Sequence, residues 1–138
     1  MFGHRPALAA LIALIATAAP ASAATLHLKA PKQVERADSF RVSAFGKAKP
    51  QHHYRLSVVY QDDDQGDCAR TIAKEVTRNE HFAIFYLTKV VTDKDGRFEV
   101  TSQEIVGGDK KTSGRFCGYL TNKKGKNKDR VVRRIEFT

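Results

Sequence analysis

Short stretches in which apolar and polar residues alternate recur along most of the chain. In residues 25–30, Leu26 and Leu28 alternate with His27 and Lys29. A period of two is typical of strands with one buried face. The same pattern predicts strands at residues 40–44, 54–60, 97–100, 114–120 and 131–137. Residues 81–91 are rich in aromatic and β-branched side chains, which favour a well-buried strand.

One segment departs from this pattern. Within residues 68–78, Ile72 and Val76 lie four positions apart, and several neighbouring residues are good helix formers. Asp67 is suited to cap the start of a helix and Asn79 to end it. The sequence therefore predicts one short helix between the third and fourth strands.

About seven short strands, turn signals every 8–12 residues and a single helix favour an immunoglobulin-like (Ig-like) β-sandwich. A small β-barrel is the alternative. In Ig lettering the strands begin near residues 25 (A), 39 (B), 54 (C), 82 (E), 97 (beside E), 115 (F) and 131 (G). The chain lacks tryptophan, and its cysteines do not fall on strands B and F. We therefore expect a sandwich by architecture but not an antibody-type domain.

The N-terminal segment has the features of a secretory signal peptide. Arg5 precedes an apolar run at residues 7–19, Pro20 follows, and Ala21–Ala23 has the small-x-small form of a cleavage site. The alternative, a membrane anchor, would need about 20 apolar residues. We therefore expect cleavage after Ala23, no membrane-spanning segment in the mature chain, and export of residues 24–138 as one domain.

The chain has two cysteines, Cys68 and Cys117. In a small exported domain such a pair predicts a disulfide, and a free nucleophilic cysteine is the alternative. Strands C and F are antiparallel neighbours in an Ig-like sheet, which brings the end of C beside the start of F. A bond closing this loop of about 50 residues would contribute about 4 kcal/mol of stability.

The formal net charge is +9, and the cations gather in two connections. The B–C loop, which also holds His52 and His53, and the F–G turn fall at the same end of the predicted sandwich. The candidate anion-binding residues are Lys47, Lys49, Lys123, Lys124, Lys126, Lys128 and Arg130. A cationic tip would hold lipid head groups, wall polymers, glycans or nucleic acid. The alternative is a solvated turn without a partner, and no motif indicates sequence-specific nucleic-acid recognition.

Other candidate sites are less distinctive. Asp62, Asp64 and Asp67 could hold calcium through their carboxylates or could simply be solvated. His52 and His53 lack the spacing of a zinc site. Residues 93–96 end in the Asp-Gly pair typical of a tight hairpin. We find no catalytic or cofactor motif.

Four short motifs carry a resemblance to a loose group of small exported bacterial proteins with Ig-like sandwiches. They are residues 40–46, residues 68–71 with Glu75, residues 96–98, and residues 117–120. The resemblance implies a fold and an exported location but no activity. We expect a non-catalytic module that binds an anionic envelope or extracellular polymer. The alternatives are a secreted inhibitor or accessory protein that docks on another protein, and a small hydrolase or metal-binding protein.

Overall fold

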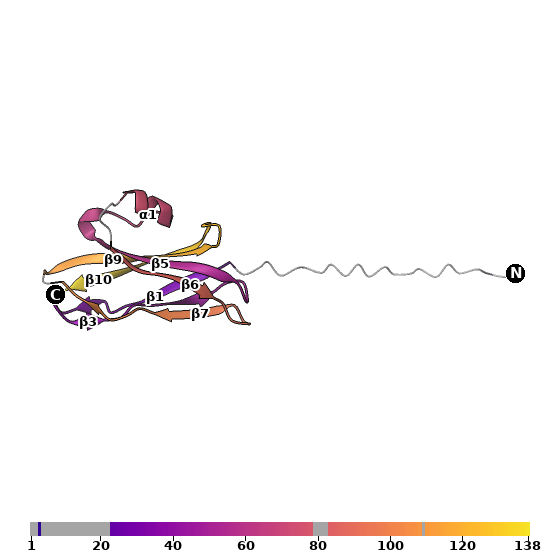
Figure 1. The fold of residues 1–138 in the computed structure, drawn as a ribbon, viewed down its shortest axis with the longest axis horizontal. Helices are drawn as coiled ribbons and strands as arrows, with labels where there is room; N and C mark the ends of the chain where they lie inside the picture. The colour runs from indigo at the N-terminus through magenta and orange to yellow at the C-terminus, as the bar shows by residue number, and fades with distance from the viewer. Residues whose placement is uncertain (1–2, 4–22, 79–82, 109) are drawn as a thin grey trace.

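The computed structural model describes residues 3, 23–78, 83–108 and 110–138 (Figure 1). The signal peptide predicted for residues 1–23 lies almost wholly outside the described residues. The described part contains ten strands, a 3₁₀ turn and one α-helix. In chain order the elements are β1 (Thr25–Lys29), β2 (Gln33–Val34), β3 (Ser39–Phe40), β4 (Ser43–Lys47), β5 (His53–Asp62), the 3₁₀ turn (Asp63–Gln65), α1 (Ile72–Arg78), β6 (Ala83–Val91), β7 (Arg97–Thr101), β8 (Ile105–Val106), β9 (Thr112–Asn122) and β10 (Asn127–Phe137). Within these ranges, no helix has both the length and the apolar composition needed to cross a bilayer.

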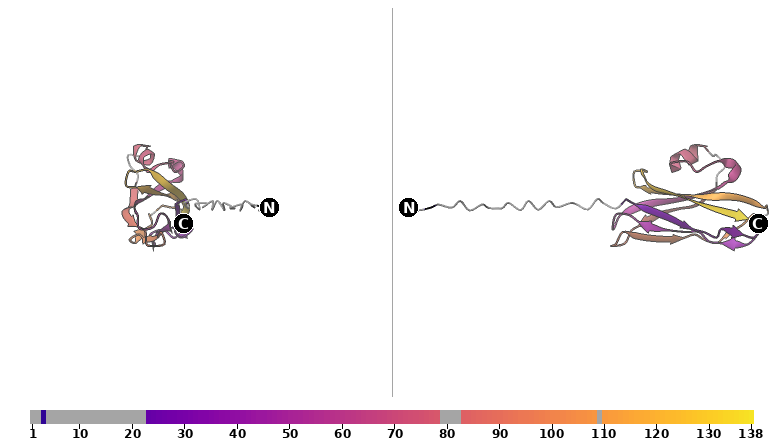
Figure 2. Two further views of the ribbon diagram at one scale, coloured as in Figure 1. Left: turned by 90° about the vertical axis from the view of Figure 1, so that its right-hand side faces the viewer. Right: turned by 180° about the vertical axis from the view of Figure 1, so that it is seen from behind.

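The strands form the two layers of a β-sandwich, which confirms the predicted fold class (Figures 1 and 2). One layer has the order β1-β4-β7, with the short pair β3-β8 beside it. The other has the order β2-β10-β9-β5-β6, and α1 lies over its outer face.

The alternating apolar residues of the two layers meet in one core. The three-stranded layer contributes Leu26, Leu28, Ala44 and Phe98. The five-stranded layer contributes Leu56, Phe116, Leu120 and Ile135, among others. Burial of these side chains is the main force that holds the layers together.

The predicted pairing of the third and sixth strands is confirmed. β5 and β9 are antiparallel, with Asp62 opposite Gly114 and Val59 opposite Cys117. Cys68 therefore follows the end of β5 close to the early part of β9. Cys68 and Cys117 form a disulfide with their Cα atoms 5.7 Å apart, as predicted.

The fourth predicted strand belongs to a different layer from the one expected. Strand E of an Ig-like sandwich lies beside strand B, but β6 pairs with β5 instead, and β7 takes the place beside β4. The Asp93–Gly96 turn forms, with the N–H of Gly96 donating to the carbonyl of Asp93 at 3.0 Å. It joins strands of different layers, however, so the hairpin prediction is wrong. Local turn chemistry specifies a reversal of the chain, whereas the pairing partner is decided by distant strands.

The helix begins later than predicted. Its first residue is Ile72, and the hydroxyl of Thr71 accepts the backbone N–H of Lys74 at 3.2 Å. Thr71 therefore fills the capping position assigned to Asp67, whose carboxylate contacts Arg115 instead. Asn79, the predicted helix end, lies outside the described residues.

Two further segments also differ from the prediction. The single strand expected at residues 40–44 is divided into β3 and β4, and between them the N–H of Val42 donates to the hydroxyl of Ser102 at 3.0 Å. The loop expected at residues 102–114 contains β8, which pairs with β3, and the start of β9. Two-residue strands are too short to show an alternating pattern.

Candidate functional site: the basic end of the sandwich

Three connections meet at one end of the sandwich: the β4–β5 loop, the β6–β7 turn and the β9–β10 turn. Thr92 fastens the first two together. Its hydroxyl donates to the carbonyl of Lys49 at 2.6 Å and accepts the N–H of His52 at 2.9 Å. The N–H of Ala48 also donates to the carbonyl of Gly96 at 2.8 Å. The backbone of this end is therefore held by internal hydrogen bonds.

The β9–β10 turn presents its lysines to solvent. The side-chain oxygen of Asn122 accepts the N–H groups of Lys124 and Lys126 at 3.0 and 2.9 Å. Gly125 has a φ of 79°, a conformation that residues with a Cβ rarely adopt. The side chains of Lys123, Lys124 and Lys126 are all exposed.

The β4–β5 loop and the β9–β10 turn enclose a groove of about 370 Å³, which we call the tip groove. It is lined by Gln51, His52, His53, Asn122, Lys123 and Lys124. Among these residues none carries a carboxylate. The two connections therefore lie together as the strand order predicted, and the lysines that line the groove are Lys123 and Lys124.

The other predicted lysines surround the tip groove without lining it. Lys49 is exposed in the β4–β5 loop, and Lys126 and Lys128 are exposed on the β9–β10 hairpin. Lys47 lines a second groove on the outer face of β4. The structure thus brings Lys123 and Lys124 together with the two histidines and spreads the remaining lysines around them.

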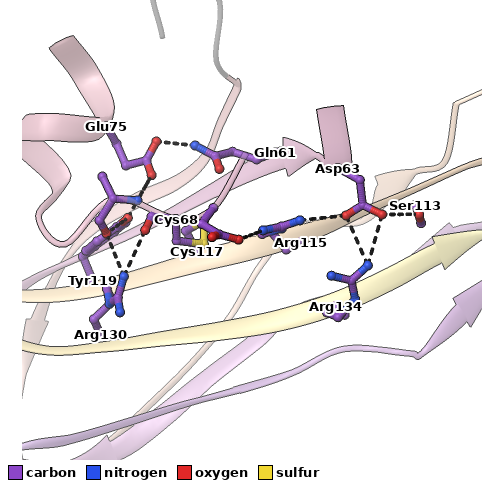
Figure 3. Close-up of polar contacts among 12 residues, drawn as sticks. Gln61, Asp63, Cys68, Glu75, Ser113, Arg115, Cys117, Tyr119, Arg130 and Arg134 are labelled. Atoms are coloured by element: carbon purple, nitrogen blue, oxygen red, sulfur yellow. Dashed lines mark hydrogen bonds and ion pairs between the residues drawn. A yellow bond between two sulfur atoms is a disulfide. The ribbon is translucent and has the colours of Figure 1, made fainter. Parts of the chain in front are cut away.

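Arg130 has a structural contact. Its Nη1 atom donates to the carbonyls of Cys68 and Ala69 at 3.0 and 3.1 Å (Figure 3). These bonds attach the segment after the disulfide cysteine to β10. Of the candidate anion-binding residues, Arg130 thus serves the fold, and it does not line the tip groove.

Two pairs of like charges face each other across neighbouring strands near this end. Lys47 lies opposite Arg97 on β4 and β7, and Arg55 lies opposite Lys89 on β5 and β6. All four side chains are exposed, and none forms an ion pair within the described part of the chain. Like charges directly opposite each other are unfavourable in a sheet. A bound anion would relieve the repulsion between Arg55 and Lys89. Beside Arg97, the carboxylate of Asp93 already supplies a negative charge and accepts the backbone N–H of Arg97 at 2.8 Å.

Sequence reasoning missed Arg55, Lys89 and Arg97 as candidates. Each occupies an outward position of a predicted strand, so its exposure could have been anticipated. The missing information was the register, which places these cations opposite one another.

The acidic segment lies at the other end, where arginines neutralise it (Figure 3). Asp63 contacts Nη2 of Arg115 at 2.9 Å and Nη2 of Arg134 at 3.1 Å, and it accepts a hydrogen bond from Ser113. Nη1 of Arg115 contacts Asp67 at 2.6 Å. The hydrogen bonds from Ser113 and Arg115 lower the pKa of Asp63. The bond to Asp63 raises the pKa of Arg115 further, despite opposing desolvation.

The alternative of a calcium site at this turn is not supported. Asp67 is engaged by Arg115, and an oxygen of Asp62 accepts the hydroxyl of Tyr60 at 2.8 Å. The described residues include no group of three or more histidine, cysteine or acidic side chains arranged to hold a metal.

The segment from Cys68 to Glu75 is fastened to the sheet by a buried cluster (Figure 3). Glu75 of α1 is fully buried, and its carboxylate accepts Nε2 of Gln61 and the N–H of Ala69. The hydroxyl of Tyr119 donates to the carbonyl of Ala69 at 2.7 Å. These contacts surround the disulfide. The sequence indicated Glu75 as a helix former and as part of one of the four resemblance motifs, but it did not predict the burial of Glu75, because a buried carboxylate looks like a surface one in the sequence.

No protein-family model matches the chain, and a search of curated proteins finds no significant relative. The site must therefore be interpreted from its own chemistry.

Proposed function

We propose that the protein is an exported, non-catalytic module that binds anionic polymers or anionic surfaces through its basic end. The observation that supports this proposal most directly is the composition of the tip groove. It is lined by Lys123, Lys124, His52 and His53, and no lining residue carries a carboxylate. Exposed cations of this kind attract polyanions through long-range electrostatics that salt weakens.

Export is supported by two features of the chain. The Cys68–Cys117 disulfide is of a kind that persists in oxidising compartments. The pattern of residues 1–23 predicts the secretory signal. The resemblance to small exported bacterial proteins with Ig-like sandwiches is consistent with both.

The test is binding to vesicles that contain anionic lipid and to an anionic resin across a salt series. We expect the affinity to fall steeply with salt. Lys123→Glu with Lys124→Glu should lower it at least tenfold. The matched control, Lys110→Glu with Lys111→Glu, makes the same charge change at exposed positions between β8 and β9. An equal loss of affinity in both variants would contradict the proposal that binding depends on the basic end. Retention on the resin that is unchanged at high salt would contradict it as well.

The second candidate function is docking on another protein through a sheet edge. β6 is the outermost strand of its layer, and Leu87 on it is 63% exposed. An edge strand with apolar side chains can pair with a strand of a partner. Amide hydrogen exchange along β6 tests this candidate. A bound partner strand would pair with the backbone and slow exchange along β6, whereas a polyanion held by side chains such as Lys89 would leave the backbone N–H groups of β6 unpaired with the ligand.

A further inference from the structure

The outer face of the three-stranded layer has an ordered arrangement of side chains. The strand registers place its residues in three rows, which are Thr25–Lys47–Arg97, His27–Phe45–Glu99 and Lys29–Ser43–Thr101. Successive rows lie about 7 Å apart along the strands. The row nearest the basic end carries two cations.

The middle row holds an aromatic pair. The rings of His27 and Phe45 are stacked, with their centroids 5.2 Å apart and their planes at 27°. Phe45 is 39% exposed. An apolar ring on an otherwise polar sheet face is costly unless something covers it. The two rings cover part of each other, and the pair leaves an exposed aromatic surface between the polar rows, which we call the platform.

This face is the floor of a shallow groove of about 910 Å³, which we call the sheet groove. Val91 and Asp93 line it together with residues of all three strands. Val91 also lies opposite His53, which lines the tip groove. The two grooves therefore adjoin at this pair of residues.

The sheet groove offers hydrogen-bonding groups of both kinds. Lys47 and Arg97 are cationic, whereas Glu99 supplies a carboxylate in the aromatic row. Asp93 supplies a second carboxylate, which is occupied by the backbone N–H groups of Asp95 and Arg97 at 2.8 Å. The hydroxyls of Ser43 and Thr101 lie 3.0 Å apart in the row beyond. The groove thus differs from the tip groove, whose charged lining is cationic.

We propose that the sheet groove extends the basic end into a binding site for a linear acidic polysaccharide in which charged sugars alternate with uncharged ones. The inference rests on the proposed function and names its ligand class. The apolar C–H face of a sugar ring packs on the platform of Phe45 and His27. Sugar hydroxyls donate to Glu99, and the acidic groups of the polymer pair with Lys47 and Arg97.

Other polyanions fit this combination less well. A single-stranded nucleic acid carries a phosphate on every unit, so a phosphate would fall beside the carboxylate of Glu99. A membrane surface is flat and would meet the rim of the groove but not its aromatic floor. A polysaccharide with neutral units between its charges satisfies the platform, the carboxylate and the cations together.

The probe is a series of hyaluronan oligosaccharides, in which glucuronate alternates with an uncharged amino sugar, titrated by calorimetry. We expect affinity to rise with length until the three rows and the tip groove are covered. Phe45→Ala should lower the affinity of the longest oligosaccharide about tenfold, the scale of one aromatic contact. Phe45→Tyr should restore it. The matched control is Val132→Ala, an exposed apolar residue on β10 of the other layer, which should change the affinity less than twofold.

Two further ligands separate this inference from the proposed function. Anionic vesicles and a single-stranded oligothymidylate are titrated under the same conditions. Salt-sensitive binding to vesicles without binding to hyaluronan would overturn the polysaccharide inference and leave the proposed function standing. Tighter binding to the oligothymidylate, or equal losses for Phe45→Ala and Val132→Ala, would also overturn the inference. Failure to bind any of the three polyanions would overturn both.

Discussion

The two ends of the sandwich both carry clustered charges, but they use them differently. At the acidic end, Arg115 and Arg134 project from neighbouring strands onto Asp63. At the basic end, Lys47 faces Arg97 and other cations surround the tip groove. The acidic end pairs its charges internally, whereas the lysines of the basic end are exposed to solvent.

The difference shows that a charged segment must be judged with its neighbours in space. The run of aspartates after β5 looks in the sequence like a solvated or metal-binding turn, yet Asp63 and Asp67 hold Arg115 over the sheet. The lysines of the β9–β10 turn look equally solvated, and in the structure Lys123 and Lys124 line a groove with two histidines and no acidic residue. Charges that are paired fix the fold, and charges that remain unpaired are available for binding.

The largest expected effect is that of removing the Cys68–Cys117 disulfide, which fastens the segment after the aspartates to β9. Cys68→Ala with Cys117→Ala should lower the free energy of unfolding by about 2–5 kcal/mol, because the disulfide restricts the unfolded chain. The measurement is urea unfolding followed by circular dichroism. Reduction of the unmodified protein serves as the control and should give a similar loss. A loss below about 1 kcal/mol would show that the buried contacts of Glu75 suffice without the bond.

A smaller effect should separate the two arginines of the acidic end. The side chain of Arg115 is only 10% exposed, whereas that of Arg134 is 64% exposed. Arg115→Gln should cost about 1–3 kcal/mol, since the buried side chain at this position would lose its charge-assisted hydrogen bonds to Asp63 and Asp67. Arg134→Gln is the matched control on the same aspartate and should cost at most about 1 kcal/mol. Equal losses in urea unfolding would contradict the distinction between the two pairs.

Much of the fold could be predicted from the sequence, because alternation reports directly on burial. The strands predicted at residues 25–30 and 54–60 are confirmed as β1 and β5, and so is the pairing of Cys68 with Cys117. The layer of β6 could not be predicted, since the Asp-Gly turn after it specifies a local reversal and says nothing of which distant edge is open.

Less of the candidate site could be predicted. The strand order determines which loops lie at the same end of a sandwich. The proximity of His53 to Lys123 and Lys124 could therefore be predicted from the sequence. The pairing of Arg55 with Lys89 and the stacking of His27 on Phe45 depend on strand register. Register is set by the packing of the whole sheet and has no local signal in the sequence.

The basic end should gain stability when its repulsion is removed. Lys89→Glu places a carboxylate opposite Arg55 and should raise the free energy of unfolding by about 0.2–1 kcal/mol, while it weakens binding to anionic vesicles. Lys111→Glu, at an exposed site outside the basic end, is the control. Greater stability with weaker binding would support a surface shaped for a partner. A loss of stability would show that the facing cations do not repel each other appreciably.

The smallest expected effect is a loss of folding stability at low pH, and it depends on Asp63 at the acidic end. The bonds from Ser113 and Arg115 hold the pKa of Asp63 below its ordinary value, so the ionised carboxylate favours the folded state. That contribution is complete above the unfolded pKa, about 4, and is lost as the pH falls through the lower folded value. Stability measured by urea unfolding should therefore decline below about pH 4.

Asp63→Asn should make this decline shallower, because the group that takes up the proton on unfolding is gone. Asp64→Asn is the matched control, one residue along, and it leaves the contacts of Asp63 with Arg115 and Ser113 in place. The full decline should therefore persist in the control. If both variants kept the same acid slope as the unmodified protein, the ion pairs of Asp63 would contribute little to the folded state. The contrast between a paired end and an unpaired end would then rest on Arg115 and Asp67 alone.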